Sequence, residues 1–296
     1  MTPLRVLVGV LNYNAIEDCI DTVRSLRRLT YPAFDLLIVD NASTNDAAQL
    51  VAAATAGTAL ESNAVNSGYA GGMNSLLDRG VARGYDYVLL CNNDIDVGPD
   101  ALDRLVATAQ ACPDAAVIGG VELAWQTGAV RCVGGLKHGL IRSRTRWSLH
   151  VPESPQRFAF PQGALLLVDV AAVKRGLRFD DGLFMYFEEA DIGFRLHEMG
   201  RTAVVDPGVR IRHKADARHL VPRNGYLQQR NRVRLVRRHG RPWQLAAHLA
   251  YVALLELPAK VIARSLQGHL AFARACLLGF VDGVRGTTGR GAAAWL

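Results

Sequence analysis

The sequence predicts a doubly wound α/β fold followed by a set of C-terminal helices, and three observations lead to this prediction. Apolar runs typical of buried parallel strands alternate with amphipathic helical segments through most of the chain. Polar residues follow the ends of three of these runs. After residue 213 the strand-like runs stop, and one basic and two apolar helical segments take their place.

The predicted strands are short runs of apolar and β-branched residues. Residues 4–11 (LRVLVGVL) form the first, residues 35–40 (DLLIVD) the second and residues 85–92 (YDYVLLCN) the third. Shorter strands are predicted at residues 116–120, 164–168 and 202–205. Right-handed crossovers place the carboxyl ends of such strands along one crevice, where ligands of open α/β sheets bind.

The predicted helices lie between and after these strands. Residues 16–29 carry an apolar stripe, and residues 100–111 form a second helix. Beyond the sheet, helices are predicted at residues 228–239, 243–257 and 266–281. The apolar helix that ends before Pro258 is shorter than the roughly 20 residues that span a bilayer. It is therefore expected either to pack on the domain or to lie on a membrane surface.

Composition restricts the class of protein. The chain has 296 residues, 50% of them hydrophobic and 21% charged, which is enough apolar material for one large core and a small appendage. The N-terminus lacks the pattern of a signal peptide, and the five cysteines are scattered without a CxxC pair. Neither a disulfide framework nor a zinc site is expected, and a cytoplasmic location is favoured.

Polar side chains follow three predicted strands, at residues 12–14, 40–45 and 92–96, and are expected to converge in the crevice. Asp94 and Asp96 lie two positions apart on one of these loops. Two such carboxylates can share a hard divalent cation such as Mg²⁺ or Mn²⁺. The alternative is a solvated turn with an acidic cap before the next helix.

Residues 66–74 (NSGYAGGMN) form a glycine-rich loop that opens a helix. Such a loop lets backbone amides approach an anionic ligand closely. The loop matches neither GxGxxG nor GxxxxGK[ST], so it predicts neither a Rossmann dinucleotide site nor a P-loop.

Residues 184–196 place three acids beside aromatic residues. Crowding and partial burial raise carboxyl pKa values, which would suit Glu188, Glu189 or Asp191 to act as a general base. The alternative is an acidic helix N-terminus that the helix dipole favours. His213, beside Lys214, is either a surface residue or a ligand.

In this order, these segments resemble the family 2 glycosyltransferases. The matching blocks are residues 10–14 (VLNYN), 39–43 (VDNAS), 66–74, 89–102 (LLCNNDIDVGPDAL), 163–168, 179–181 and 184–196, with His213. Together they cover roughly residues 4–215. The subgroup that they resemble is the rhamnosyltransferase-like enzymes of cell-envelope polysaccharide synthesis.

The resemblance implies a GT-A fold, which is a Rossmann-like, mixed and mainly parallel sheet with helices on both faces. It implies a catalytic domain at residues 1–215, with a nucleotide-sugar half at about 1–97 and an acceptor half at about 98–215. Residues 216–296 would then form a basic and amphipathic helical region.

The resemblance also implies roles for individual residues. Tyr13 and Asp40 would hold the nucleobase, and Glu189 would be the catalytic base. Nucleotide-sugar binding is expected from Leu11, Asn12, Tyr13, Asp40, Asn41, Asn66, Gly72, Asn74, Asn93 and Asp94. A divalent metal (Mg²⁺ or Mn²⁺) would be bound by Asp94, Asp96 and His213, and the acceptor by Phe184, Tyr186 and Glu188.

The chain departs from the family pattern at two places. It reads FEEAD where the family commonly has FEDxDL, which makes Asp191 the alternative base. Asp96 adds a second acid after the usual metal motif, and its role is open.

The implied reaction is inverting transfer of a sugar from a nucleoside-diphosphate donor to a saccharide or lipid-linked acceptor. The favoured donor is dTDP-rhamnose, with UDP-hexose, UDP-hexosamine or UDP-galactofuranose as alternatives. A nucleotidyltransferase is disfavoured because residues 12–14 stand where its basic, glycine-rich loop would be. A nucleic-acid partner is not expected, because acids in a crevice repel phosphate unless a metal intervenes. An inactive relative that still binds donor is a further alternative.

The positive charge of the chain gathers in one segment. The net charge is +7, and residues 210–241 contain eleven Lys or Arg and one acid. This segment predicts a local anionic partner, such as the inner face of a cell membrane that carries a lipid-linked acceptor. The alternative is that Arg230, Arg232, Arg234 and their neighbours pair acids of the catalytic domain or bind the donor diphosphate.

Overall fold

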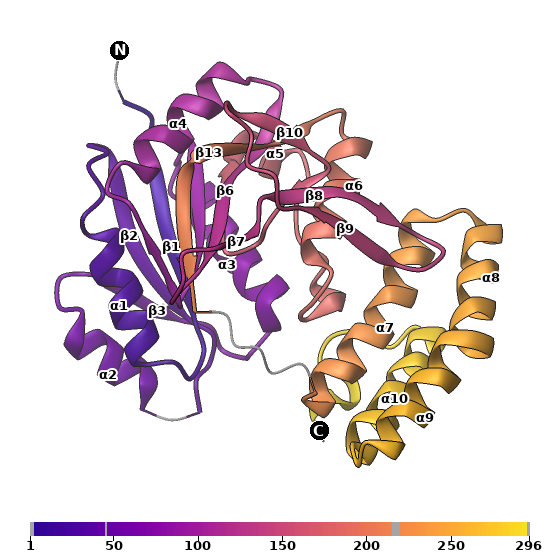
Figure 1. The fold of residues 1–296 in the computed structure, drawn as a ribbon. Helices are drawn as coiled ribbons and strands as arrows, with labels where there is room; N and C mark the ends of the chain where they lie inside the picture. Colours follow the sequence, from indigo (N-terminus) through magenta and orange to yellow (C-terminus); the bar gives the residue numbers. More distant parts are fainter. Residues whose placement is uncertain (1–2, 45, 215–219, 295–296) are drawn as a thin grey trace.

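The computed structural model describes residues 3–44, 46–214 and 220–294, and it confirms the predicted α/β fold with C-terminal helices (Figure 1). The first part alternates strands and helices, which are β1 (Val6–Asn12), α1 (Glu17–Leu26), β2 (Phe34–Asp40), α2 (Ala47–Ala54), β3 (Ala59–Ser62), α3 (Gly68–Ala82), β4 (Tyr87–Asn92), β5 (Ile95–Val97) and α4 (Ala101–Ala111). The second part contains β6 (Ala115–Ala124), β12 (Leu165–Asp169), α5 (Val170–Lys174), η1 (Asp181–Leu183), α6 (Glu188–Glu198) and β13 (Thr202–His213).

The central sheet is mixed, with a parallel half that contains the N-terminal strands. Its order is β10-β13-β6-β12-β4-β1-β2-β3. Strands β4, β1, β2 and β3 run parallel, so their carboxyl ends share one edge. Strand β12 runs antiparallel between β4 and β6. Because helices cover both faces of the sheet, β1 is apolar along its length, and Val6, Val8 and Val10 are fully buried.

Each face of the sheet has its own apolar core. On one face, Val23 of α1 and Leu105 of α4 belong to the same buried cluster as Val8 of β1. On the other face, Leu76 of α3 and Val173 of α5 belong to a second cluster. These two layers fix the strand ends and the loops that follow them.

Residues 130–161 form short strands that the sequence did not predict. They are β7 (Val130–Cys132), β8 (Gly134–Gly139), β9 (Arg144–Ser148), β10 (Gln156–Phe158) and β11 (Phe160–Pro161). Strands β11, β8 and β9 form a separate three-stranded sheet. In β9 (RTRWS) only Ser148 is buried, so this strand lacks the alternating apolar pattern from which a strand is predicted.

The C-terminal region contains α7 (Pro222–His239), α8 (Pro242–Tyr251), η2 (Val252–Glu256), α9 (Leu257–Leu266), α10 (Leu270–Arg285) and η3 (Gly291–Ala294). The predicted domain boundary at residue 215 lies outside the described residues. Helix α10 packs along α7 so closely that a Cβ on Gly279 would lie 2.2 Å from the carbonyl oxygen of Tyr226. Only glycine permits this approach of the two backbones.

The expectation that the apolar helix ends before Pro258 is wrong. Segments α8, η2 and α9 are continuous, and η2 is a π-helical turn directly before Leu257 and Pro258. A proline cannot donate to the carbonyl four residues earlier, and a wider turn accommodates its ring. The resulting helix, Pro242–Leu266, has 25 residues and is long and apolar enough to cross a membrane by length and composition.

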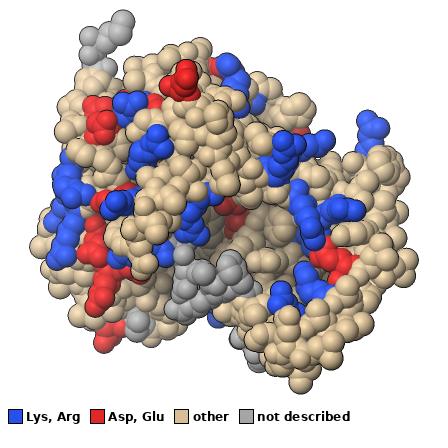
Figure 2. All heavy atoms as spheres, viewed as in Figure 1, with Lys and Arg blue, Asp and Glu red and all other residues tan. Residues whose placement is uncertain are grey.

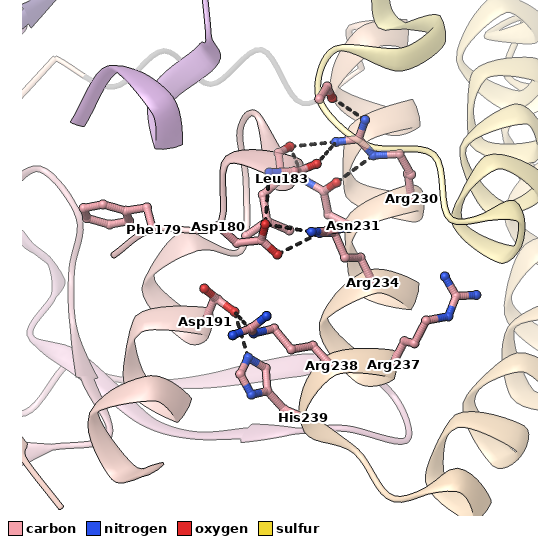
Figure 3. A network of polar contacts seen from close by, with 12 residues as sticks. Phe179, Asp180, Leu183, Asp191, Arg230, Asn231, Arg234, Arg237, Arg238 and His239 are labelled. Atoms are coloured by element: carbon pink, nitrogen blue, oxygen red, sulfur yellow. Dashed lines mark hydrogen bonds and ion pairs between the residues drawn. The ribbon is translucent and has the colours of Figure 1, made fainter. Parts of the chain in front are cut away.

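Arg230 and Arg234 of α7 face the protein, and the expected anionic membrane partner of the basic segment stays a prediction. Arg230 is fully buried and donates to the carbonyl oxygens of Gly182 and Leu183 at 3.1 and 2.7 Å (Figure 3). Arg234 binds both oxygens of Asp180, at 2.7 and 2.8 Å. The alternative expectation, that these arginines pair acids of the main domain, is confirmed for Arg234.

Candidate functional site

Two adjoining pockets open at the carboxyl ends of β1, β2 and β4. The first pocket has a volume of about 270 Å³ and the second about 470 Å³. Tyr69, Asn92 and Met185 belong to the walls of both, so the pockets form one continuous cleft. Figure 2 shows the surface hollowed between the main domain and the C-terminal helices. A third cavity, of about 370 Å³, lies beside α6 and contains none of the predicted site residues.

Six of the ten predicted nucleotide-sugar residues lie in the wall of the first pocket, and these are Leu11, Tyr13, Asn41, Asn66, Asn93 and Asp94. Asn41 holds this wall together. Its Nδ2 donates to Asn66 Oδ1 at 3.2 Å and to the Gly68 carbonyl at 2.9 Å. Because α3 begins at Gly68, these bonds fix a helix N-terminus beside the pocket. The amides of Gly68 and Ala70 already donate to Asn66 Oδ1 and to the Phe184 carbonyl, so what this end offers an anion is chiefly the positive end of the helix dipole.

Asp40 and Asn12 lie behind the wall rather than in it. Asp40 is 2% exposed, and its carboxylate accepts hydrogen bonds from Ser43 N at 2.9 Å, Ser43 Oγ at 2.6 Å and Asn12 Nδ2 at 3.3 Å. Asn12 Oδ1 in turn accepts from Asn93 Nδ2 at 3.0 Å. Asp40 therefore positions Asn93 through Asn12. This arrangement does not offer the expected direct contact between Asp40 and a nucleobase.

Asn74 and Gly72 also lie outside the wall, where they serve packing. Asn74 Nδ2 donates to the Phe179 carbonyl at 3.0 Å and to Asp181 Oδ1 at 2.6 Å. These bonds tie α3 to the chain that leads into η1. Gly72 faces the side chain of Leu11, where α3 rests on β1.

Asp94 and His213 lie side by side at the edge of the cleft. Antiparallel pairing of β5 with β13 sets His213 opposite Ile95. His213 Nε2 lies 3.1 Å from Asp94 Oδ1, and Nδ1 lies 3.0 Å from Glu122 Oε1. Burial alone would lower the pKa of His213, but the hydrogen bonds to Asp94 and Glu122 outweigh it and raise the pKa from 6.5 to about 9.

This pair fits a divalent cation. Carboxylate and imidazole groups are suitable ligands, and Glu122 holds the other ring nitrogen as carboxylates do for metal-bound histidines. Asn92 Oδ1, beside His213, is buried without a hydrogen-bond partner in the described parts of the chain. In residues 3–44, 46–214 and 220–294, no three His, Cys, Asp or Glu side chains gather to hold a metal ion. A cation at Asp94 and His213 would therefore need ligand oxygens to complete its shell.

Asp96 does not join this pair. Its carboxylate accepts a hydrogen bond from Arg28 Nη2 at 2.7 Å, on the side of α1, and it lies in neither pocket wall. The expectation that Asp96 binds the metal is corrected accordingly.

The segment between η1 and α6 has an unusual backbone that α7 holds in place. Phe184, Tyr186 and Phe187 have φ angles of 64°, 78° and 77°, which are costly for residues other than glycine. Asn231 Nδ2 donates to the carbonyl oxygens of Leu183, Met185 and Tyr186, at 2.9, 2.7 and 3.1 Å. Helix α7 thus stabilises the strained backbone that leads into α6.

Glu188 and Glu189 begin α6 and lie in the wall of the second pocket. Burial, and then repulsion from Glu189, raises the pKa of Glu188. Burial also raises the pKa of Glu189, and Glu122 adds to the effect. Because two crowded carboxylates resist simultaneous ionisation, the deeper Glu188 favours the neutral form. The more exposed Glu189 is then the carboxylate that can take a proton from a ligand hydroxyl.

Glu189 rests against Gly163, in the loop before β12. A Cβ on Gly163 would lie 2.6 Å from Glu189 Oε1. Tyr69 Oη donates to the Gly163 carbonyl at 2.6 Å and so fixes this loop from the other side. The absence of a side chain at Gly163 gives the Glu189 carboxylate its space.

Asp191 is not placed to act as the alternative base. Its side chain is fully buried and lies in neither pocket wall. Oδ2 accepts from Arg195 Nε at 2.5 Å, and Oδ1 lies 2.7 Å from His239 Nε2 (Figure 3). Asp191 therefore anchors α6 to the end of α7, and the structure corrects the expectation.

The second pocket contains Tyr186 and Glu188 as expected of acceptor residues, whereas Phe184 lies in the first. Trp147 also lines the second pocket and was missed, because its strand β9 was not predicted. Its ring packs edge-on against Phe160 with centroids 5.4 Å apart, which leaves an aromatic surface toward the pocket. Arg223 in the first pocket was missed because no strand end precedes it.

Comparisons with known proteins show which family the chain resembles. The family model of glycosyl transferase family 2 matches residues 7–127. The N-acetylglucosaminyl-diphospho-decaprenol L-rhamnosyltransferase of Mycobacterium tuberculosis is 27% identical over 213 residues, which are 64% of this chain and 69% of that protein.

Solved structures show the same fold at low sequence identity. The mannosyltransferase PcManGT from Pyrobaculum calidifontis, in complex with GDP-Man and Mn²⁺, has a TM-score of 0.60 at 15% identity, over 96% of this chain and 88% of that one. S. aureus TarS 1–349, in complex with UDP-GlcNAc, has a TM-score of 0.59 at 14% identity, over 95% and 82%.

GalNAc-T7 with UDP, GalNAc and Mn²⁺ has a TM-score of 0.64 at 14% identity, over 80% of this chain. The match spans about half of that protein, 48% of its length. The family match over residues 7–127 and the rhamnosyltransferase relative show that the chain resembles the glycosyl transferase family 2 proteins and, among them, a rhamnosyltransferase.

Proposed function

We propose that the protein is an inverting glycosyltransferase that moves a sugar from a nucleoside-diphosphate donor to an acceptor hydroxyl. This proposal rests on the observation that the two pockets share part of their walls. The first pocket has the α3 N-terminus and Asp94, and the second has Glu189. A sugar at the shared wall would lie between a site for its diphosphate and a general base.

Direct displacement is the chemistry that this arrangement supports. The acceptor oxygen attacks the anomeric carbon while Glu189 takes its proton. The bond from that carbon to the diphosphate oxygen breaks, and its electron pair leaves with the diphosphate. Among the described residues, Asp94 is the one carboxylate in the first pocket, and it faces His213. A covalent sugar intermediate on a first-pocket carboxylate is therefore disfavoured, and a single displacement inverts the anomeric configuration.

Asp94 and His213 would hold Mg²⁺ or Mn²⁺ together with phosphate oxygens of the donor. When bound, such a cation neutralises charge that develops on the leaving diphosphate. The description of PcManGT and of GalNAc-T7 with Mn²⁺ supports this choice of cofactor. The N-terminal end of α3, which Asn41 fixes, would add the attraction of its helix dipole for the same anion.

The donor that we favour is dTDP-rhamnose, and the acceptor is a sugar linked to a prenyl diphosphate. The relative's description as an N-acetylglucosaminyl-diphospho-decaprenol L-rhamnosyltransferase supports both choices. Rhamnose carries a methyl group at C6, and Met73, Phe184 and Met185 give the first pocket an apolar side that suits it. A UDP-sugar is the second candidate, because TarS is described with UDP-GlcNAc.

A transfer assay distinguishes these donors. Purified protein with Mn²⁺ is incubated with prenyl-diphosphate-linked N-acetylglucosamine and, in parallel, with dTDP-L-rhamnose, UDP-GlcNAc, UDP-glucose or UDP-galactofuranose. Mass spectrometry should detect a rhamnosyl product, and NMR should show its anomeric configuration inverted relative to the donor. A product from a UDP-sugar alone would reject rhamnose, and a retained configuration would reject direct displacement.

Gly163→Ala is expected to lower the turnover number by at least about tenfold and to leave donor affinity within about twofold. The added methyl group would meet Glu189 Oε1, so the base must move, and small misplacements of a reacting group cost large factors in rate. Gly139→Ala is the matched control, because its Cβ would meet only the Arg144 carbonyl oxygen, at an ordinary contact distance of 3.9 Å. Steady-state rates of both variants, with melting temperatures to confirm folding, check this prediction. Full turnover of Gly163→Ala would show that Glu189 need not stay where it is.

The protein is proposed to bind a membrane surface, and the part that would contact the membrane is the outer face of α8–α10 rather than α7. Trp243, Leu254, Ile262 and Leu266 are 58%, 74%, 60% and 84% exposed. The acids of residues 242–294 are Glu256, which binds Arg232, and Asp282, which accepts from Tyr226. Figure 2 shows much of this surface as uncharged. An apolar face whose exposed charges are basic suits an anionic lipid surface.

An interfacial position fits this helix better than a spanning one, because its other face makes polar contacts with the rest of the protein. Glu256 is buried against Arg232 of α7, and His248 Nδ1 lies 2.8 Å from the carbonyl oxygen of Ile141. Burying such polar contacts in lipid would be costly, whereas burying the apolar face alone is favourable. The protein would thus lie on the cytoplasmic face of the cell membrane, next to a lipid-linked acceptor.

Full-length protein is expected to co-sediment with vesicles of phosphatidylglycerol and phosphatidylcholine, less with pure phosphatidylcholine, and less as salt rises. The triple variant Leu254→Gln, Ile262→Gln, Leu266→Gln should bind at least about tenfold more weakly, because it removes buried apolar area. Leu50→Gln with Val65→Gln is the matched control, since both residues are exposed on the main domain. Equal binding by the triple variant, or no binding of the wild type at low salt, would contradict this location.

A further inference from the structure

The C-terminal tail folds back onto the site. Helix α10 ends at Arg285, and the chain then returns along α7. Gly289 N donates to the Gly182 carbonyl at 2.9 Å, and Arg230 donates to the Gly289 carbonyl. Ala292 N donates to Tyr226 Oη at 3.0 Å. The buried Arg230 therefore holds the tail and the η1 segment together, as Figure 3 shows for its contacts with η1.

This return brings two arginines into the first pocket. Arg223 lies in the first turn of α7 and Arg290 lies in the tail, and both line the same pocket as Asp94. Within the described part of the chain, neither forms an ion pair, and Arg223 Nε is buried without a hydrogen-bond partner. By contrast, Arg230, Arg232, Arg234, Arg237 and Arg238 of α7 all bind protein groups.

We infer that Arg223 and Arg290 form a clamp for the diphosphate of the donor, an inference that rests on the proposed function. Within the described residues these two guanidinium groups form no ion pair although they line one small pocket, which suits an anionic ligand, and guanidinium groups match phosphate oxygens with two parallel hydrogen bonds. When the bond from the anomeric carbon to the diphosphate breaks, its electron pair stays on the phosphate oxygen. The clamp is placed to bind that growing charge from the C-terminal side, and Asp94 and His213 are the residues that would hold a cation at the strand ends.

The test separates binding of phosphates from binding of the nucleoside. Titration calorimetry with Mn²⁺ measures the affinities of UDP, dTDP and GDP, and of the matching monophosphates and nucleosides. The proteins are wild type, Arg223→Gln, Arg290→Gln, the double variant, and Arg274→Gln as a control on the exposed part of α10. Arg223→Lys is added because it keeps the charge but loses the two-pronged geometry.

Each Gln variant should bind the preferred diphosphate at least about tenfold more weakly, and the double variant about a hundredfold, as expected for hydrogen bonds between charged groups. Nucleoside affinity should stay within about twofold, so the preference for diphosphate over monophosphate should shrink. Arg223→Lys should recover part of the loss, and Arg274→Gln should match the wild type.

The outcomes distinguish failure of the clamp alone from failure of both the clamp and the proposed function. If the wild type binds a diphosphate but the double variant binds it within twofold, the clamp is wrong and the proposed function stands. If the variants lose nucleoside and diphosphate affinity in proportion, the arginines only support the fold, which also overturns the clamp. If the wild type binds none of the three diphosphates, both the clamp and the proposed function fail.

Discussion

Glu189→Gln is expected to reduce sugar transfer by about 10²–10⁴-fold, the usual contribution of a positioned general base. The amide keeps the shape of the side chain but cannot accept the proton of the acceptor hydroxyl. Donor affinity should stay within a few-fold, because Glu189 lies in the second pocket and the donor nucleotide is proposed to bind the first. Initial rates of transfer and titration of the nucleoside diphosphate measure the two effects separately.

The pH dependence of the wild type gives a second readout of the same residue. Burial raises the pKa of Glu189 above its ordinary 4.5. Because a base works only when deprotonated, kcat/KM should fall as pH decreases through this raised value, so the acidic limb should lie above pH 4.5. Glu189→Gln should lose that limb.

Two controls use the same helix. Glu198→Gln, at the far end of α6, should keep wild-type turnover, because its side chain is 58% exposed and faces His239. Glu188→Gln should be milder than Glu189→Gln, because Glu188 already favours the neutral form. If Glu189→Gln keeps most of the turnover, another group is the base.

Asp94→Asn and His213→Ala are each expected to lower turnover by at least about a hundredfold and to weaken Mn²⁺-supported binding of the diphosphate. The two side chains lie 3.1 Å apart, and neither forms a cation site alone. Chelation with EDTA should abolish wild-type transfer, and added Mn²⁺ or Mg²⁺ should restore it. Rates across a series of metal concentrations for the wild type and both variants test this expectation.

Asp96→Asn is the matched control, since Asp96 is the neighbouring acid of the same motif but binds Arg28. Its metal dependence should match that of the wild type. Transfer that survives exhaustive chelation, or a metal requirement lost in Asp96→Asn but kept in Asp94→Asn, would reject the assignment.

The strand ends and their motifs could be predicted because each signal is local in sequence. An apolar run followed by polar residues placed Asn93 and Asp94 at a sheet edge, and both line the first pocket. The same reasoning placed Asp40 and Asn74 in the nucleotide-sugar site, but neither residue lines the first pocket. Whether a polar side chain faces a ligand or the protein depends on hydrogen-bond partners such as Ser43 and Phe179. Those partners come from tertiary structure, which no spacing reveals.

Contacts between residues far apart in the sequence explain the remaining differences between the predicted and the observed structure. Glu122 supports His213 from a strand 91 residues away, and its own sequence context gave no sign of this. The basic composition of α7 indicated an anionic partner, but Asp180 and Asp191 of the protein itself are the partners of Arg234 and Arg238. Pro258 predicted a helix end, yet the π-helical turn before it keeps the helix continuous.

A nucleotide-sugar is proposed to bind the first pocket through a cation held by Asp94 and His213. Thermal denaturation with a panel of nucleotide-sugars, with and without Mn²⁺, tests it most directly, because a ligand that binds only the folded state raises the melting temperature. One class of nucleotide-sugar should raise the melting temperature of the wild type only when Mn²⁺ is present, and Asp94→Asn should lose this shift. An unchanged melting temperature with every nucleotide-sugar, or an equal shift in Asp94→Asn, would contradict the claim.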